Sequence, residues 1–77
     1  MILRCYASTI EITGNDTHEI DTTPQNISLL RDWLIEKWPA LQHTTFAISI
    51  NRKIISDPNH PITENDEVAL LPPFSGG

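Results

Sequence analysis

The chain has 77 residues, of which 39% are hydrophobic and 19% charged, and its ten acidic and five basic residues give a formal net charge of -5. This length supports one small domain with a core of marginal size and leaves no room for a large catalytic cleft. The basic residues are scattered, whereas binding to a nucleic-acid backbone needs them clustered. We therefore expect a single domain over residues 1–77 that binds no nucleic acid, with an acidic balance that favours solubility and a protein partner.

The cysteine, the histidines and the apolar runs of the sequence give no sign of a metal site, a membrane span or a secretion signal. Cys5 is the single cysteine, so neither an internal disulfide nor a cysteine-rich zinc site can form, which suits a reducing cytoplasm. His18, His43 and His60 lack the spacing of metal ligands. No apolar run approaches the ~20 residues that span a bilayer, and the N-terminus has no signal-peptide pattern. We expect a cytoplasmic protein without metal or membrane contact.

The N-terminal part of the chain predicts two strands joined by a turn. Residues 1–7 alternate as a half-buried strand does, with Leu3 and Cys5 on the inward face. We therefore expect Cys5 to be a small core residue and not a reactive thiol. Turn residues Gly14-Asn15-Asp16 separate this strand from a second one over residues 18–22.

A helix is predicted next. Thr23-Pro24 resembles a helix start, because threonine caps free N–H groups and proline is favoured at the first helical position. Pro39 would clash with the carbonyl four residues earlier, so we expect the helix to end at Lys37 or Trp38, which leaves Leu41 in the exit loop. The apolar residues return to one face of a 3.6-residue period. This stripe consists of Ile27, Leu30, Leu34, Trp38 and Leu41.

Three further strands are predicted over residues 44–51, 53–56 and 67–71, with Val68 and Leu70 of the last strand turned inward. The element order is therefore ββαβββ. One amphipathic helix can cover one face of a mixed sheet of four to five strands. The sequence predicts a two-layer α+β domain whose other sheet face meets solvent.

The last residues of the chain predict a projecting tail over residues 72–77. Pro72 and Pro73 end the last strand because neither can donate a hydrogen bond to a neighbouring strand. Phe74-Ser75-Gly76-Gly77 then continues away from the body. Two stiff prolines followed by a tip of residues without Cβ atoms form a thin rod, which can enter a narrow channel in another protein.

The motifs of the chain closely resemble those of the small subunits of molybdopterin synthase, a family of ubiquitin-like sulfur carriers. Residues 66–77 read D-E-V-A, L-L-P-P and F-S-G-G, and the family has D-E-V-A, two apolar residues, P-P, a two-residue spacer and G-G. Residues 6–14 resemble its aromatic-Ala pattern with Glu and Gly, and Ile50-Asn51-Arg52 and Pro61-Ile62-Thr63 match two further turns. The resemblance covers nearly the whole chain and implies a β-grasp fold.

The family chemistry implies a role for the tail. An E1-like adenylating enzyme uses ATP to convert the C-terminal carboxylate of Gly77 into an acyl-adenylate, and a sulfur donor displaces AMP to leave a thiocarboxylate. The tail, with Pro72, Pro73, Phe74, Ser75 and Gly76, enters a channel of the large catalytic subunit, and sulfur passes to a cyclic pyranopterin. Two small and two large subunits assemble in the family. The resemblance thus implies a non-catalytic sulfur donor with no bound cofactor, and any residue added after Gly77 should abolish activity.

The resemblance also implies a docking surface. In a β-grasp sheet the first and last strands are parallel neighbours, so the outward Tyr6 and Leu71 should lie close together with Ala69 beside them. A central aromatic side chain is a common anchor of protein contacts. One residue departs from the family pattern, because Ile10 occupies a position where the family usually has arginine. A salt bridge made by that arginine to a partner is therefore absent here.

Other functions fit parts of the sequence. A Gly-Gly ending is shared by sulfur carriers for thiamine precursors or tRNA thiolation and by ubiquitin-like protein modifiers, and only the Pro72-Pro73 pair favours molybdopterin. A β-grasp binding module without sulfur chemistry is a more distant alternative. A stand-alone enzyme is disfavoured because the sequence contains no acid-base constellation.

Overall fold

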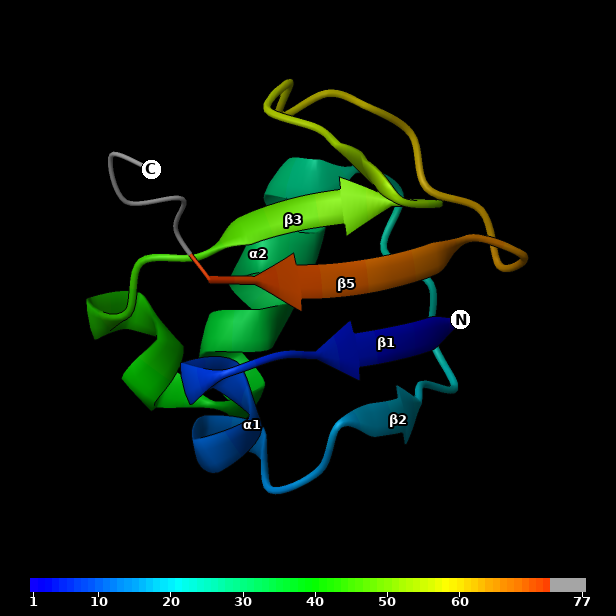
Figure 1. The fold of residues 1–77 in the computed structure, drawn as a ribbon. Coiled ribbons are helices and arrows are strands. Elements are labelled where there is room, and N and C mark those ends of the chain that lie inside the picture. The colour runs from blue at the N-terminus through cyan, green and yellow to red at the C-terminus, as the bar shows by residue number, and fades with distance from the viewer. Residues whose placement is uncertain (73–77) are drawn as a thin grey trace.

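A mixed five-stranded sheet in the order β2-β1-β5-β3-β4 organises residues 1–72, the part of the chain that the computed structural model describes (Figure 1). Strands β1 and β5 are parallel, whereas the pairs β1-β2, β5-β3 and β3-β4 are antiparallel. The strands are β1 (Ile2–Cys5), β2 (Thr17–Glu19), β3 (Ala47–Ile50), β4 (Lys53–Ile54) and β5 (Glu67–Leu71).

The main helix, α2 (Ile27–Lys37), lies across one face of this sheet (Figure 1). Two shorter helical segments, α1 (Ser8–Thr13) and the 3-10 helix η1 (Pro39–His43), lie together at the edge where β1 and β5 end (Figure 1). The predicted two-layer α+β architecture with one main helix is therefore confirmed, and the two short helical segments are additions to the predicted element order.

The core lies between α2 and the inward face of the central strands. Leu3 and Leu70 from the sheet and Leu30 and Leu34 from the helix are fully buried. Burying a leucine side chain of this kind contributes about 1.5–3 kcal/mol relative to leaving it exposed. The predicted helical stripe is correct at its core-facing positions, and Trp38 packs against the cluster while partly exposed.

The helix starts later than predicted. Asn26 is the N-cap residue, and its side-chain oxygen accepts a hydrogen bond of 2.9 Å from the backbone N–H of Leu29. The preceding segment instead pairs with the loop before β5, because the N–H of Ile62 donates to the carbonyl of Gln25 over 3.0 Å. Thr23 and Pro24 therefore precede the helix, since Asn26 supplies a side-chain cap three residues later.

The first strand is shorter than predicted and leads into a helix that was not predicted. β1 ends at Cys5, and Ala7 has φ 54° and ψ -128°, a conformation that a residue with a Cβ atom rarely adopts. α1 follows, so Ile10 and Ile12 pack against the core from a helix. Leu41, expected in an exit loop, is buried within η1.

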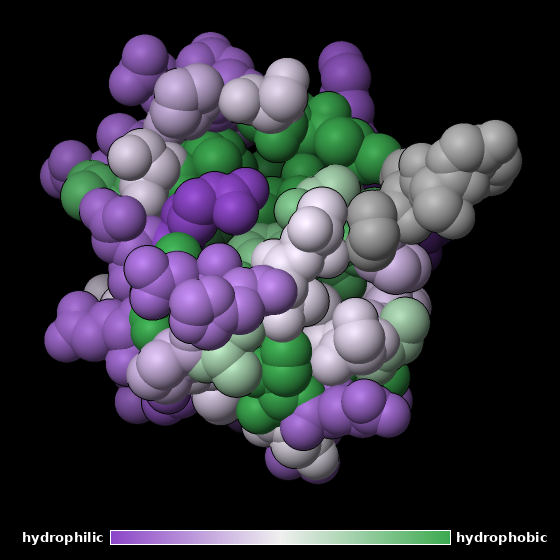
Figure 2. All heavy atoms as spheres, turned by 90° about the vertical axis from the view of Figure 1, so that its left-hand side faces the viewer, coloured by the Kyte–Doolittle hydropathy of each residue, from purple (hydrophilic) through white to green (hydrophobic). Residues whose placement is uncertain are grey.

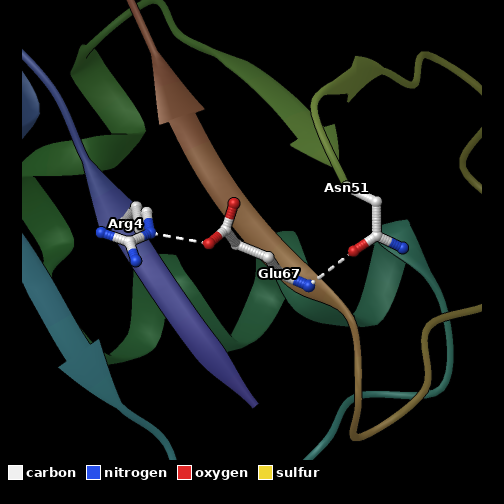
Figure 3. Close-up of polar contacts among 3 residues, drawn as sticks. All are labelled: Arg4, Asn51 and Glu67. Carbon is white, nitrogen blue, oxygen red and sulfur yellow. Dashed lines mark hydrogen bonds and ion pairs between the residues drawn. The ribbon is translucent and has the colours of Figure 1, made fainter.

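A tight hairpin joins β3 to β4 and is tied to the start of β5. Asn51 and Arg52 have φ values of 51° and 71°, as expected for a two-residue type I′ turn. The Asn51 side chain accepts a hydrogen bond from the Glu67 backbone N–H over 2.9 Å (Figure 3) and donates one to Asp66 over 2.9 Å. These contacts fix where β5 begins.

Acidification should weaken the fold through Asp66. The backbone N–H of Thr63 and the side-chain amide of Asn51 lower the pKa of the Asp66 carboxyl. A carboxyl whose pKa is lower in the folded chain stabilises that state above the unfolded-state pKa, and the contribution is lost as pH falls through the folded-state value. We expect the unfolding free energy, measured by urea denaturation, to decline more steeply below about pH 4 in the unmodified chain than in Asp66→Asn.

The matched control is Glu64→Gln, which changes an exposed carboxyl in the same turn. It should retain the steep decline of the unmodified chain. Identical pH profiles for the unmodified chain and Asp66→Asn would contradict the assignment.

Candidate functional site

The candidate site is the end of the sheet at which β5 is followed by the C-terminal segment. β1 and β5 run in parallel with Cys5 opposite Leu70, so both strands end at this side of the molecule (Figure 1). Leu71 is the last residue of β5 and pairs with Ala47 of β3. The described chain therefore ends one residue past the middle strand of the sheet, which has β1 on one side and β3 on the other.

The three side chains predicted to form a docking surface differ in exposure. Tyr6 is 45% exposed and lies one residue past the last β1–β5 pair, while Leu71 is partly exposed. Ala69 lies on the same sheet face but is only 7% exposed, because its neighbours across the sheet are Arg4 and Ser49. The surface thus has two apolar side chains near the exit and a flat position behind them.

A buried hydroxyl, which sequence reasoning missed, holds the end of β1 against α1. Thr9 is fully buried, and its Oγ1 accepts a hydrogen bond of 2.9 Å from the Tyr6 backbone N–H and donates one of 2.6 Å to the Tyr6 carbonyl. The same oxygen lies 3.5 Å from the carbonyl oxygen of Leu70. Threonine commonly bonds to nearby backbone at helix starts, which is the signal that could have identified it.

A charged pair occupies the opposite end of the same sheet face. Arg4 Nε and Glu67 Oε2 are 2.7 Å apart, and both side chains are partly solvent-exposed (Figure 3). The hydrogen bond to Glu67, and then the charge of its carboxylate, raise the pKa of Arg4. The sheet face is therefore charged near the start of β5 and apolar near its end, where the C-terminal segment departs.

Ile10, where the family usually has arginine, is partly buried and packs against the core. This side chain therefore contributes to packing of α1 and presents no charge to a partner. Cys5 is a buried core residue as predicted. Its side chain is 1% exposed, and desolvation by this burial raises the pKa of its thiol. A thiol in this state is a poor nucleophile.

His18 lies against an aromatic cluster and not with other potential ligands. Its ring centroid is 5.0 Å from that of Trp38, which in turn lies 6.0 Å from Trp33. Within residues 1–72, no group of three His, Cys, Asp or Glu side chains is placed to hold a metal ion. No helix in the described part of the chain has the length and apolar character needed to cross a membrane.

Most of the predicted tail lies outside the described residues. Pro72 directly follows β5 and is partly exposed. The predictions for Pro73, Phe74, Ser75, Gly76 and Gly77 concern residues that the structure does not describe.

Comparisons with known proteins place this geometry in a family. Residues 3–77 match the ThiS family. The chain is 30% identical over 76 residues to the molybdopterin synthase sulfur carrier subunit of Escherichia coli (strain K12), an alignment that covers 94% of this chain and 93% of that protein.

Two solved structures share the fold. A putative molybdopterin converting factor subunit 1 from Pyrococcus furiosus gives a TM-score of 0.82 at 16% identity, with 94% of each chain covered. A protein-protein complex of subunits 1 and 2 of the molybdopterin-converting factor from Helicobacter pylori 26695 contains a chain with a TM-score of 0.63 and 25% identity, covering 99% of this chain and 96% of that one. The protein belongs to the ThiS family and has a ubiquitin-like β-grasp fold.

Proposed function

We propose that the protein is the sulfur carrier subunit of a molybdopterin synthase. The observation that carries the proposal is the motif D-E-V-A, L-L-P-P and F-S-G-G of residues 66–77, whose residues Glu67–Leu71 form β5, the middle strand of the sheet, in a chain of the family described above. The relative from Escherichia coli with that printed name supports the choice of product. The pair Pro72-Pro73 favours this product over those of other Gly-Gly carriers.

The proposed chemistry occurs at the terminal carboxylate of Gly77. This carboxylate attacks the α-phosphate of ATP bound to an E1-like adenylating enzyme, so pyrophosphate leaves and an acyl-adenylate forms. A donor that supplies sulfur at the oxidation level of sulfide then displaces AMP, and a carbon–sulfur bond replaces the carbon–oxygen bond. Glycines at the last two positions leave the acyl carbon unobstructed and allow many backbone conformations.

The proposed partner in the next step is a large catalytic subunit that accepts the tail and passes its sulfur to a cyclic pyranopterin. The complex of two converting-factor subunits from Helicobacter pylori supports a partner of this kind. Tyr6 and Leu71 border the exit of the tail, and we assign them the first contacts with that subunit. Once the large subunit holds the tail in one geometry, proximity lowers the entropic part of the barrier to sulfur transfer.

The primary test is the intact mass of the untagged protein purified from its own cells under reducing conditions. A sulfur carrier should yield a species in which one oxygen atom is replaced by sulfur, and fragmentation should place the change on Gly77. Deletion of Gly77 should remove this species because the reacting carbon is lost. Incubation with the activating enzyme, ATP and sulfide should increase it.

The same measurement separates the alternatives. Protein that stays unmodified when enzyme, ATP and sulfide are all supplied would contradict the sulfur-carrier proposal and favour a binding module. Isopeptide bonds from Gly77 to lysines of other proteins would favour a modifier. A thiocarboxylate that the large subunit leaves intact while thiamine or tRNA thiolation proceeds would identify another product.

Truncation of Tyr6 should weaken docking onto the large subunit. We expect Tyr6→Ala to raise the Kd for that subunit roughly tenfold, the scale of a lost aromatic anchor of about 1.4 kcal/mol. Leu29→Ala is the matched control, because Leu29 is also 45% exposed but belongs to α2 on the other layer. Titration calorimetry measures both values, and equal Kd values for the two variants would contradict docking through the sheet face.

A further inference from the structure

Tyr6 lies at the point where β1 leaves the sheet. The pairing of β1 with β5 ends at Cys5 and Leu70, while β5 continues to Leu71, which pairs with β3. The backbone of Tyr6 therefore lies beyond the strand pairing that fixes the rest of β1, and its side chain is 45% exposed. A contact other than the sheet must hold this residue if it is to meet a partner in a defined orientation.

One buried residue, Thr9, supplies that contact. Its Oγ1 accepts a hydrogen bond of 2.9 Å from the backbone N–H of Tyr6 and donates one of 2.6 Å to the Tyr6 carbonyl. The backbone N–H of Thr9 donates to the same carbonyl over 3.2 Å. Both polar groups of the Tyr6 backbone are thus bonded to Thr9. With these groups fixed, the Cα–Cβ direction of Tyr6 is fixed too, and only the two torsions of its side chain remain free.

The backbone between these two residues is strained. Ala7 has φ 54° and ψ -128°, which are the values of the first central position of a type II′ turn, where glycine is preferred. A residue with a Cβ atom stays in such a conformation only where the surrounding contacts enforce it. The hydrogen bonds of Thr9 do so, because they join the residue before Ala7 to a side chain anchored in the core. Without the hydroxyl, we expect Ala7 to relax and to change the direction of Tyr6.

The direction of single side chains matters at this end of the molecule. Figure 2 views the side on which β1 and β5 end, and it shows hydrophobic side chains in separate groups among hydrophilic ones. No uniform apolar surface that could accept a partner in many orientations covers the part in view. The Thr9 hydroxyl also lies 3.5 Å from the carbonyl oxygen of Leu70, so it fixes Tyr6 beside the end of β5.

We propose that Thr9 is a positioning residue for docking: its hydroxyl holds the strained turn at Ala7 and so keeps Tyr6 in the orientation that the large subunit binds. The inference rests on the proposed function, which supplies that partner and assigns Tyr6 its contact. A side chain that is already held in its bound orientation loses less conformational entropy on association. Because Thr9 is buried, it acts on the partner only through Tyr6.

Calorimetric titration of the large subunit with Thr9 variants tests the proposal. Thr9→Val keeps the branched shape but leaves the Tyr6 N–H without its acceptor, so we expect it to raise the Kd roughly three- to tenfold. Thr9→Ser keeps the hydroxyl and should retain the Kd of the unmodified chain. The matched control is Thr13→Val, because Thr13 is also buried in α1 and its Oγ1 donates to the Asn15 carbonyl over 3.1 Å. It should lower the urea midpoint of unfolding without changing the Kd. Equal Kd values for the two valine variants would overturn the proposal.

A double-mutant cycle determines whether Thr9 acts through Tyr6. The anchor is absent from Tyr6→Ala, so adding Thr9→Val to that variant should leave the Kd at the value that Tyr6→Ala alone produces. Two independent effects would instead multiply. A Kd raised by the product of the two single effects would therefore overturn the proposal, because Thr9 would then support docking by a route that does not involve the Tyr6 side chain.

Hydrogen exchange on the unmodified chain needs neither a variant nor a partner. The Tyr6 amide proton should exchange far more slowly than an unprotected amide, because its acceptor is a buried oxygen. Exchange at the unprotected rate would overturn the proposal even if Thr9→Val failed to fold. A chain with a protected Tyr6 amide that does not bind the large subunit would contradict the proposed function. A chain that binds it equally well with and without the Thr9 hydroxyl would contradict only this inference.

Discussion

The parallel pairing of β1 with β5 is the constraint on which the rest of the structure depends. Its register places Leu3 opposite Val68 and Cys5 opposite Leu70, so four buried side chains from the two ends of the sequence meet in the core. Parallel strands cannot be joined by a tight turn, so the remaining elements all lie in the connection between them. The same pairing brings the end of β1 next to the end of β5, where the C-terminal segment begins.

The two sheet faces follow from this pairing and have different uses. The inward face is covered by α2 and holds the large aliphatic residues. The outward face carries small residues at its centre, Ala69 and Ser49, which lie opposite each other on β5 and β3. Small side chains keep this face flat, while the Arg4–Glu67 pair makes one end charged. A flat surface with a charged end and an apolar end can orient a partner in one direction.

Sequence periodicity predicted α2 and β5 correctly, but it did not predict elements whose conformation depends on tertiary contacts, such as α1. The helical stripe around Leu30 and the alternation of β5 are local patterns, and both were correct. α1 was missed because S-T-I-E-I-T alternates and contains four β-branched residues, which favour a strand. The bonds of Thr9 to Tyr6 and the packing of Ile12 outweigh that preference.

The features of the candidate site were likewise predictable where they depend on neighbouring residues and not where they depend on contacts between elements. The end of β5 and the outward position of Leu71 were predictable from alternation and from Pro72, because both are properties of neighbouring residues. The low exposure of Ala69 and the pairing of Arg4 with Glu67 were not predictable, because each depends on residues brought together from different elements. The helix start was also misassigned, since Thr23 and Asn26 both have capping side chains and only the pairing of Gln25 with Ile62 distinguishes them.

Three titratable groups of the body have pKa values that their surroundings in the fold shift. The pKa of Cys5 is raised by burial, that of Asp66 is lowered by hydrogen bonds, and that of Arg4 is raised by Glu67. Each shift moves the pKa of its group further from pH 7, so that Cys5 stays a neutral thiol while Asp66 and Arg4 stay charged, whereas a general acid or base needs a pKa near the working pH. The three shifts therefore stabilise fixed charge states within the fold. The feature of the body that bears on the proposed function is the position of β5 in the middle of the sheet, because the C-terminal segment follows that strand.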